Sequence, residues 1–301
     1  MEEIILNSLA KINLGLEVVG LREDGYHEII TLFQTINLGD YLKFKLRSDN
    51  RIIVSGDRSD VPWDESNLIY RAALLLKNVA GLSKGIEIEV KKNIPPGRGL
   101  GGGSSNAALT LLLLNRFWQI DLPVDRLLSL AASLGADIPY FFFGGLCLGR
   151  GKGDQLDPLP DLPERWVLLV IPDFPVSTAI IYRELDQQAE FLTSRDKASK
   201  IIRFLETKDS AVIRQFENDL ELVALKIHPQ LAEIKQEIAN SGAELSMMSG
   251  SGSAVYGLFA ERTEAQRAVD KFKNKHQVFL VETVSRELYR RKLITGASPN
   301  W

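Results

Sequence analysis

The chain has 301 residues, 45% hydrophobic and 25% charged, which is ordinary for a folded globular protein of about two domains. Its 36 Lys and Arg against 39 Asp and Glu give a net charge of −3, which argues against a dedicated nucleic-acid binder. No apolar run approaches the roughly 20 residues of a membrane helix, and the acidic start lacks a secretory pattern. A single cysteine, Cys147, excludes an internal disulfide and a cysteine-based zinc cluster. We therefore expect a cytoplasmic protein.

The first predicted element is a strand with one buried face. From Lys11 to Val18 apolar and polar residues alternate, and the apolar series begins at Ile12. Lys11 and Asn13 belong to the opposite series. We therefore expect both side chains to point away from the core, where a lysine most often faces water.

Strand and helix patterns then follow one another through the first half. Strands are predicted over residues 31–47, 51–56 and 85–94, and helices over 67–80, 106–118 and 123–134. Residues 150–163 are rich in Gly, Pro and Asp, which indicates a loop or a domain junction.

The second half has the order of a ferredoxin-like domain. It reads as a strand at 166–171, helices across 177–224 and at 229–240, strands at 244–248 and 254–259, a helix at 263–274 and a strand at 278–284. Without the extra helices this is β-α-β-β-α-β. We predict an α+β fold with a mixed α/β domain over residues 1–162, a ferredoxin-like domain with extra helices over 163–301, and a frayed tail at 296–301.

A glycine-rich stretch lies between a predicted strand and a predicted helix. This glycine loop consists of Pro95, Pro96, Gly97, Arg98, Gly99, Leu100, Gly101, Gly102, Gly103, Ser104 and Ser105. Glycines let successive backbone N–H groups converge on an anion, the start of the next helix adds further N–H groups, and the two serines can add hydroxyl donors. The loop therefore predicts a phosphate site, with a flexible surface loop as the alternative.

Two other phosphate motifs fit the glycine loop less well. It lacks the Gly-Lys-Ser/Thr of a Walker A loop. It does contain G-x-G-x-x-G at positions 97, 99 and 102, the dinucleotide fingerprint of an oxidoreductase. The strand before it carries Glu87, Glu89 and Lys91 on one face, however, whereas a central parallel strand is apolar throughout. A nucleoside triphosphate site is therefore favoured.

A second loop of glycine and serine, Ser249–Ser253, stands between two predicted strands. This serine loop is either a tight hairpin turn or a second backbone wall that faces the phosphates or the substrate.

Asp137 and Lys11 are candidates for chemistry when they are taken together. Asp137 precedes the apolar run 140–143, so it is either a helix cap or a functional carboxylate in a dry pocket. Phosphoryl transfer to an alcohol needs a base for the acceptor hydroxyl and a cation near the transferred group. A carboxylate with a lysine supplies both.

The segment Asp24-Gly25-Tyr26-His27 places an aromatic ring and an imidazole at a turn. It is either a flat platform for a base or a plain hairpin with an exposed histidine. The other histidines, His228 and His276, have no carboxylate or histidine at ligand spacing and are interpreted as structural.

Three segments together resemble the GHMP kinase superfamily. They are AKINL at residues 10–14, the glycine loop with the following NAA, and MSGSGSA at 248–254, and they occur in that family's order. The strings REDGYHEIITLFQTINLGD and GADIPYFFFGG narrow the resemblance to a branch whose members act on a cytidine diphosphate alcohol in isoprenoid biosynthesis.

The resemblance implies a two-domain kinase that transfers a phosphoryl group from ATP, as Mg-ATP, to the 2-hydroxyl of that alcohol. It implies that Lys11 and Asp137 are catalytic and that the glycine loop holds the ATP phosphates. Asn13, Tyr26, His27 and Tyr182 fall in the implied substrate pocket. Arg98 is a departure, because a smaller residue is expected there. Its charge either contacts phosphate or points to solvent.

Two alternative functions would use the same fold and the same nucleotide site. One is a kinase of a smaller alcohol, such as mevalonate or homoserine, which would not need the ring platform. Another is a nucleotide-binding sensor without activity, which would not need Lys11 and Asp137.

Both substrates of the kinase are polyanions, so the cleft needs local positive charge. The candidates are Lys11, Arg98, Arg150 and Lys152.

Overall fold

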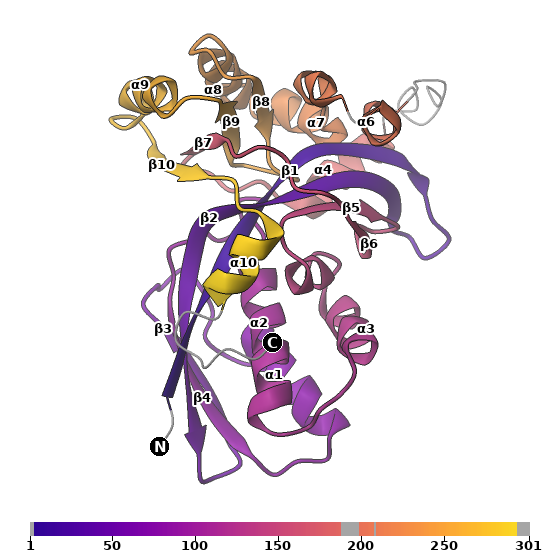
Figure 1. Ribbon diagram of the computed structural model, residues 1–301, viewed down its shortest axis with the longest axis vertical. Coiled ribbons are helices and arrows are strands. Elements are labelled where there is room, and N and C mark those ends of the chain that lie inside the picture. Colours follow the sequence, from indigo (N-terminus) through magenta and orange to yellow (C-terminus); the bar gives the residue numbers. More distant parts are fainter. Residues whose placement is uncertain (1–2, 188–198, 208, 294–301) are drawn as a thin grey trace.

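The computed structural model describes residues 3–187, 199–207 and 209–293 (Figure 1). A six-stranded sheet runs along most of the longest axis through its long hairpin, and a four-stranded sheet lies at one end of that axis (Figure 1). Within the described residues, no helix is both long enough and apolar enough to span a membrane.

The first sheet is built on this long hairpin. Its strands are β1 (Glu3–Leu21), β2 (His27–Arg47), β3 (Ile52–Gly56), β4 (Gly85–Lys91), β5 (Leu146–Arg150) and β6 (Gln155–Pro158). The order is β3-β4-β2-β5-β6, and β1 pairs antiparallel with β2. The first part of β2 pairs with β5 and its last part with β4, so β2 connects β5 and β6 to β3 and β4 in one sheet. The strand β6 lies within residues 150–163, which were predicted to be a loop or a domain junction. Pairing with β5 makes this part of the segment a strand.

Helices α1 (Leu68–Val79), α2 (Gly102–Phe117) and α3 (Val124–Leu134) pack on one side of this sheet, followed by the 3-10 turn η1 (Pro139–Phe142) (Figure 1). Asn67 caps α1, since its side chain accepts a hydrogen bond from the Ile69 N–H. The predicted start of the next helix at residue 106 is wrong. It begins at Gly102, where packing beside Ile94 and Lys92 leaves no room for a Cβ.

The second sheet confirms the predicted ferredoxin-like order. Its elements are β7 (Trp166–Ile171), α4 (Thr178–Asp186), α6 (Lys200–Thr207), η2 (Ser210–Gln215), α7 (Asp219–Ile227), α8 (Gln230–Ala239), β8 (Leu245–Met248), β9 (Val255–Phe259), α9 (Arg262–Phe272) and β10 (Gln277–Glu282). The antiparallel order is β10-β7-β9-β8. A last helix, α10 (Arg286–Leu293), was not predicted, and it packs back against β1. The predicted tail at 296–301 lies outside the described residues.

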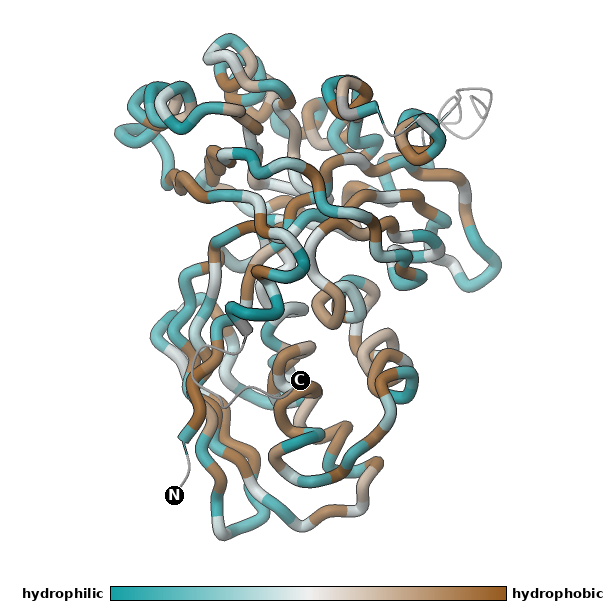
Figure 2. The backbone as a smooth tube through the Cα atoms, viewed as in Figure 1, coloured by the Kyte–Doolittle hydropathy of each residue, from teal (hydrophilic) through white to brown (hydrophobic). Residues whose placement is uncertain are grey.

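The two ends of the molecule share a buried apolar cluster. It joins Leu14 of β1 and Leu32 of β2 to Val167, Leu169 and Tyr256 of the second sheet. Apolar segments run along strands of both sheets (Figure 2). The middle of the long hairpin is therefore packed against the second sheet, and the boundary near residue 162 stays a prediction.

Candidate active site

A cleft of about 990 Å³ opens where the two halves meet. Its walls are the glycine loop, β1, the turn between α3 and η1, α4 and the serine loop. The chain thus brings together every segment that the sequence analysis marked for function.

The glycine loop forms one end of the cleft. Residues 95 to 104 line it, but Ser105 does not, since its buried hydroxyl accepts a hydrogen bond from Ser8 Oγ at 2.6 Å. Gly99 and Gly101 have positive φ values of 76° and 68°, which favour glycine. A Cβ at Gly99 would lie 1.9 Å from the carbonyl oxygen of Ser249, so the two loops touch through their backbones. Gly101 precedes α2, whose N-terminus therefore opens at the cleft.

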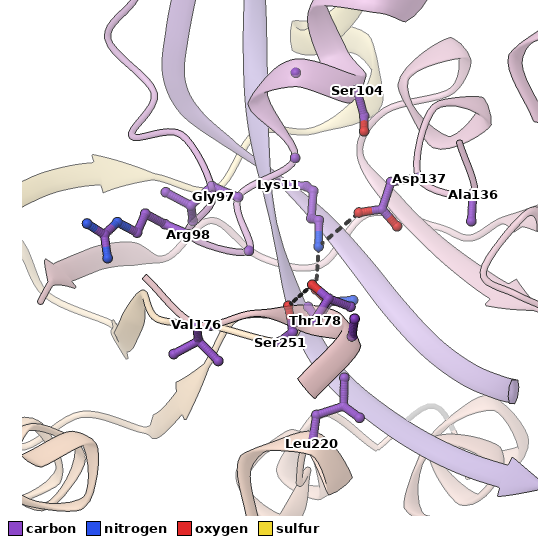
Figure 3. Close-up of a pocket in the computed structure, with 18 of the residues that line it drawn as sticks. Lys11, Gly97, Arg98, Ser104, Ala136, Asp137, Val176, Thr178, Leu220 and Ser251 are labelled. Carbon is purple, nitrogen blue, oxygen red and sulfur yellow. Dashed lines mark hydrogen bonds and ion pairs between the residues drawn. The ribbon is translucent and has the colours of Figure 1, made fainter. Parts of the chain in front are cut away.

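Lys11 lies in the middle of the cleft and points at Asp137 (Figure 3). Its Nζ lies 3.4 Å from Asp137 Oδ2 and donates to Asn13 Oδ1 at 2.6 Å. The Lys11 side chain is 4% exposed and that of Asp137 is 38% exposed. The expectation that a lysine on this face of β1 meets water is wrong, because Lys11 and Asn13 are buried under the serine loop: a Cβ at Gly250 would lie 3.4 Å from Lys11 Nζ.

The neighbours of this pair hold it in place. The Asn13 amide donates to Thr31 Oγ1 at 2.8 Å, so its oxygen is directed at Lys11. The Lys11 backbone N–H donates to the Leu100 carbonyl at 3.0 Å, which ties β1 to the glycine loop. The turn η1 begins after Ile138 without a side-chain cap, so Asp137 is not its cap. The carboxylate is left with Lys11 as its ion-pair partner.

The other end of the cleft holds His27 and Tyr182. The buried His27 ring stacks on Tyr182 at 4.6 Å, and its Nε2 lies 2.7 Å from Asp186 Oδ1. Tyr26 is exposed instead, and Lys152 Nζ lies 4.5 Å from its ring centre. The alternative of a plain hairpin with an exposed histidine is wrong, because His27 is buried. Burial, with the charge of Asp137 as a smaller cause, raises the pKa of Tyr182 far above its usual value, so its hydroxyl stays protonated.

Basic residues outnumber acidic ones along the cleft. Lys11, Lys92, Arg98, Lys152 and Arg183 line it, against Asp137 and Asp186. Arg150 does not line it and pairs with Asp157 on the surface. The guanidinium of Arg98 does not point to solvent, since it contacts the second half of the chain and extends away from Lys11 (Figure 3).

Sequence reasoning missed Lys92 and Asp186. Lys92 Nζ forms a buried ion pair with Asp40, whose other oxygen accepts the N–H groups of Asn93 and Ile94 at 2.8 Å. Extending the alternation of buried Ile86, Ile88 and Val90 by two residues places Lys92 on the inward face, so the signal was present. Asp186 stands one helical turn after Tyr182, a spacing that puts both on one face of α4.

The serine loop is a hairpin turn, and its interpretation as a wall that faces phosphates or substrate stays a prediction. It connects β8 to β9 as a hairpin turn, and Gly250, Ser251 and Gly252 also line the cleft. Ser251 Oγ lies 2.6 Å from Thr178 Oγ1 at the start of α4.

His228 stacks on Phe174 outside the cleft, in keeping with a structural role. Among the described residues, no three of His, Cys, Asp and Glu are grouped as a metal site.

Comparison with known proteins agrees with this arrangement. Residues 67–145 match the family of GHMP kinases N terminal domain, and residues 201–277 match that of GHMP kinases C terminal. A 4-diphosphocytidyl-2-C-methyl-D-erythritol kinase of Thermodesulfovibrio yellowstonii is 41% identical over 268 residues, which are 88% of this chain and 93% of the relative. One of Solibacter usitatus is 40% identical over 95% of this chain and 90% of the relative.

Solved structures show the same fold. A crystal structure of 4-(cytidine 5'-diphospho)-2C-methyl-D-erythritol kinase matches with a TM-score of 0.78 at 34% identity, over 93% of this chain and 99% of that one. Homoserine kinase from Cytophaga hutchinsonii matches with a TM-score of 0.75 at 20% identity, over 96% of each chain. The second likeness concerns the fold alone.

Proposed function

The chain belongs to the GHMP kinases, and within them to the family of 4-diphosphocytidyl-2-C-methyl-D-erythritol kinases, and from this we propose how its cleft works. It is an ATP-dependent kinase of that cytidine diphosphate alcohol, and the acceptor is the 2-hydroxyl that the sequence resemblance implies. The observation that carries the mechanism is the contact of Lys11 Nζ with Asp137 Oδ2 at 3.4 Å, between a glycine loop and a ring-lined pocket.

Asp137 is the base in this proposal. Its carboxylate is open to the cleft, so it can accept the proton of the acceptor hydroxyl as that oxygen attacks the terminal phosphorus of ATP. The new P–O bond forms while the bond from that phosphorus to the bridging oxygen of ADP breaks, and the proton goes to Asp137. A positioned base contributes about 10²–10⁴-fold to the rate.

Lys11 stabilises negative charge during this transfer. Its ammonium pairs with the Asp137 carboxylate and would offset the charge that develops on the transferred phosphoryl group. Asn13 fixes the ammonium by accepting its hydrogen bond, so the charge does not reorient when substrates bind.

The glycine loop holds the ATP phosphates in this proposal. Its backbone N–H groups and the N-terminus of α2 offer donors without side chains in the way. Ser104 adds a hydroxyl at the cleft, whereas Ser105 serves to join α2 to β1 through Ser8.

A magnesium ion fits this site as a companion of ATP. Mg²⁺ is usually held by one or two carboxylates together with substrate phosphates rather than by an all-protein cage. The Ser104 hydroxyl and the Asp137 carboxylate are the oxygen donors at the phosphate end that would hold it. The ion would neutralise charge on the phosphate oxygens.

The ring-lined pocket takes the cytidine end of the acceptor. The stacked pair of His27 and Tyr182 offers a flat surface of the size of a base, and Tyr26 adds a ring at the rim. Asn13 and Lys152 also line the cleft, where they can contact the sugar and the diphosphate. An acceptor without a base, such as mevalonate or homoserine, would leave these rings unused.

A coupled assay of ADP release tests the acceptor. The full-length chain is given Mg-ATP and, in parallel, the cytidine diphosphate alcohol, the same alcohol without the cytidine group, mevalonate and homoserine. We expect turnover with the first alone. Equal turnover with an alcohol that lacks the cytidine group would overturn the assignment of His27 and Tyr182 to the acceptor.

A further inference from the structure

Arg98 belongs to the glycine loop and lines the cleft, but its guanidinium is directed away from Lys11 (Figure 3). Its guanidinium donates to the carbonyl oxygen of Phe174 and, at 2.8 Å, to Ser253 Oγ, and both acceptors belong to the second half of the chain. Figure 3 shows the side chain extending away from Lys11 and Asp137. It is therefore badly placed to contact a phosphate that lies beside Lys11.

Three segments that line the phosphate end of the cleft converge on this residue. They are the glycine loop, the connection 172–177 between β7 and α4, and the serine loop. Ser253 Oγ also donates to the Phe174 carbonyl at 2.7 Å, so the three groups close a triangle of hydrogen bonds. The backbone repeats the connection, because Ala254 N–H donates to the Arg98 carbonyl at 3.3 Å and Ser249 Oγ to the Gly99 carbonyl at 2.9 Å.

Asp173 and Asp60 act on the charge of Arg98 only from beyond ion-pair distance. Among the described residues no carboxylate oxygen lies within 4.0 Å of its guanidinium. Partial burial lowers its pKa, but an arginine remains charged at neutral pH. A charged donor on a carbonyl makes a stronger hydrogen bond than a neutral donor. An arginine used in this way fits the role of a tether.

We propose that Arg98 is a positioning residue: it ties the serine loop and residues 172–177 to the glycine loop, so that the phosphate end of the cleft is assembled before ATP binds. Preassembly improves affinity because the loops need not be ordered at the moment of binding. The benefit concerns ATP, since all three segments meet at the phosphate end. His27 and Tyr182 lie at the other end and do not depend on it.

The test is the affinity of the full-length chain for a non-hydrolysable ATP analogue, measured by calorimetry without any acceptor. This readout does not depend on the identity of the acceptor, so it stands apart from the test of the proposed function. We expect Arg98→Met to weaken binding about tenfold and to raise the KM for ATP with little change in the acceptor KM. Arg58→Met is the matched control: Arg58 lines the small cavity beside Arg98 but pairs with Asp60, so binding should not change.

Two further variants show whether Arg98 acts through its hydrogen bonds to the other loops or only through its positive charge. Ser253→Ala removes one corner of the triangle without changing any charge, and it should also weaken binding of the analogue. Arg98→Lys keeps the charge but loses the planar pair of donors, so it should recover only part of the affinity. Wild-type affinity in Arg98→Met would overturn the proposal. Full recovery in Arg98→Lys together with an unaffected Ser253→Ala would also overturn it.

Discussion

Replacing Asp137 with Asn removes the proposed base while keeping its size. The carboxylate lies 3.4 Å from Lys11 Nζ, and at an effective dielectric constant near 20 this pair has a Coulomb energy of about 5 kcal/mol. The net effect on folding is smaller, since Asp137 is 38% exposed, and we expect a loss of about 1–2 kcal/mol of unfolding free energy. The effect on chemistry is larger: kcat should fall about 10²–10⁴-fold, with the KM for ATP nearly unchanged.

The measurement is initial-rate kinetics of ADP release at saturating concentrations of each substrate in turn. Asp186→Asn is the matched control, because it makes the same change of charge in the same cleft, 2.7 Å from His27 instead of beside Lys11. It should change the acceptor KM and leave kcat within a few-fold. If Asp137→Asn turns over at a near-normal rate, Asp137 does not accept the proton and the mechanism is wrong.

Three other predictions follow from single contacts. Lys11→Met should lower kcat at least 10²-fold while the melting temperature changes little, because methionine fills the space of the buried stem; loss of stability with intact turnover would make Lys11 structural. His27→Ala should raise the KM of the cytidine-bearing acceptor about tenfold and leave the KM of ATP unchanged, measured side by side. Burial raises the pKa of Glu221 above 4.5, so its contribution to stability is greatest below that value and is lost as pH rises through the raised pKa; urea midpoints across pH should show this decline in the wild type and not in Glu221→Gln.

Much of the fold was readable from local patterns. The period-two alternation in β4 and the asparagine cap of α1 are short-range signals, and both were interpreted correctly. The start of α2 was missed because glycine has a low helix propensity, while the packing of Gly102 against Ile94 overrides it. The short strand β6 depends on its partner β5, which no local pattern reveals.

Part of the candidate site was also predicted from the sequence, and part was not. The glycine loop and the pairing of Lys11 with Asp137 were predicted, the first from local spacing and the second from the resemblance. The surroundings of Lys11 were not, because alternation within a strand cannot tell a face open to water from a face covered by a distant loop. The same holds for His27, whose neighbours Tyr182 and Asp186 lie more than 150 residues away in the chain.

The helix α10 has a consequence for the order in which the enzyme becomes complete during synthesis. Its Tyr289 ring fills the space left open at Gly144, and its hydroxyl donates to the Phe141 carbonyl of η1 at 2.7 Å. Arg286 adds hydrogen bonds to the carbonyls of Leu146 and Leu159. The turn that carries Asp137 thus receives its last contacts from residues made some 150 positions later. The ribosome releases Lys11, the glycine loop and Asp137 early, but these residues reach their final setting only when the end of the chain has emerged.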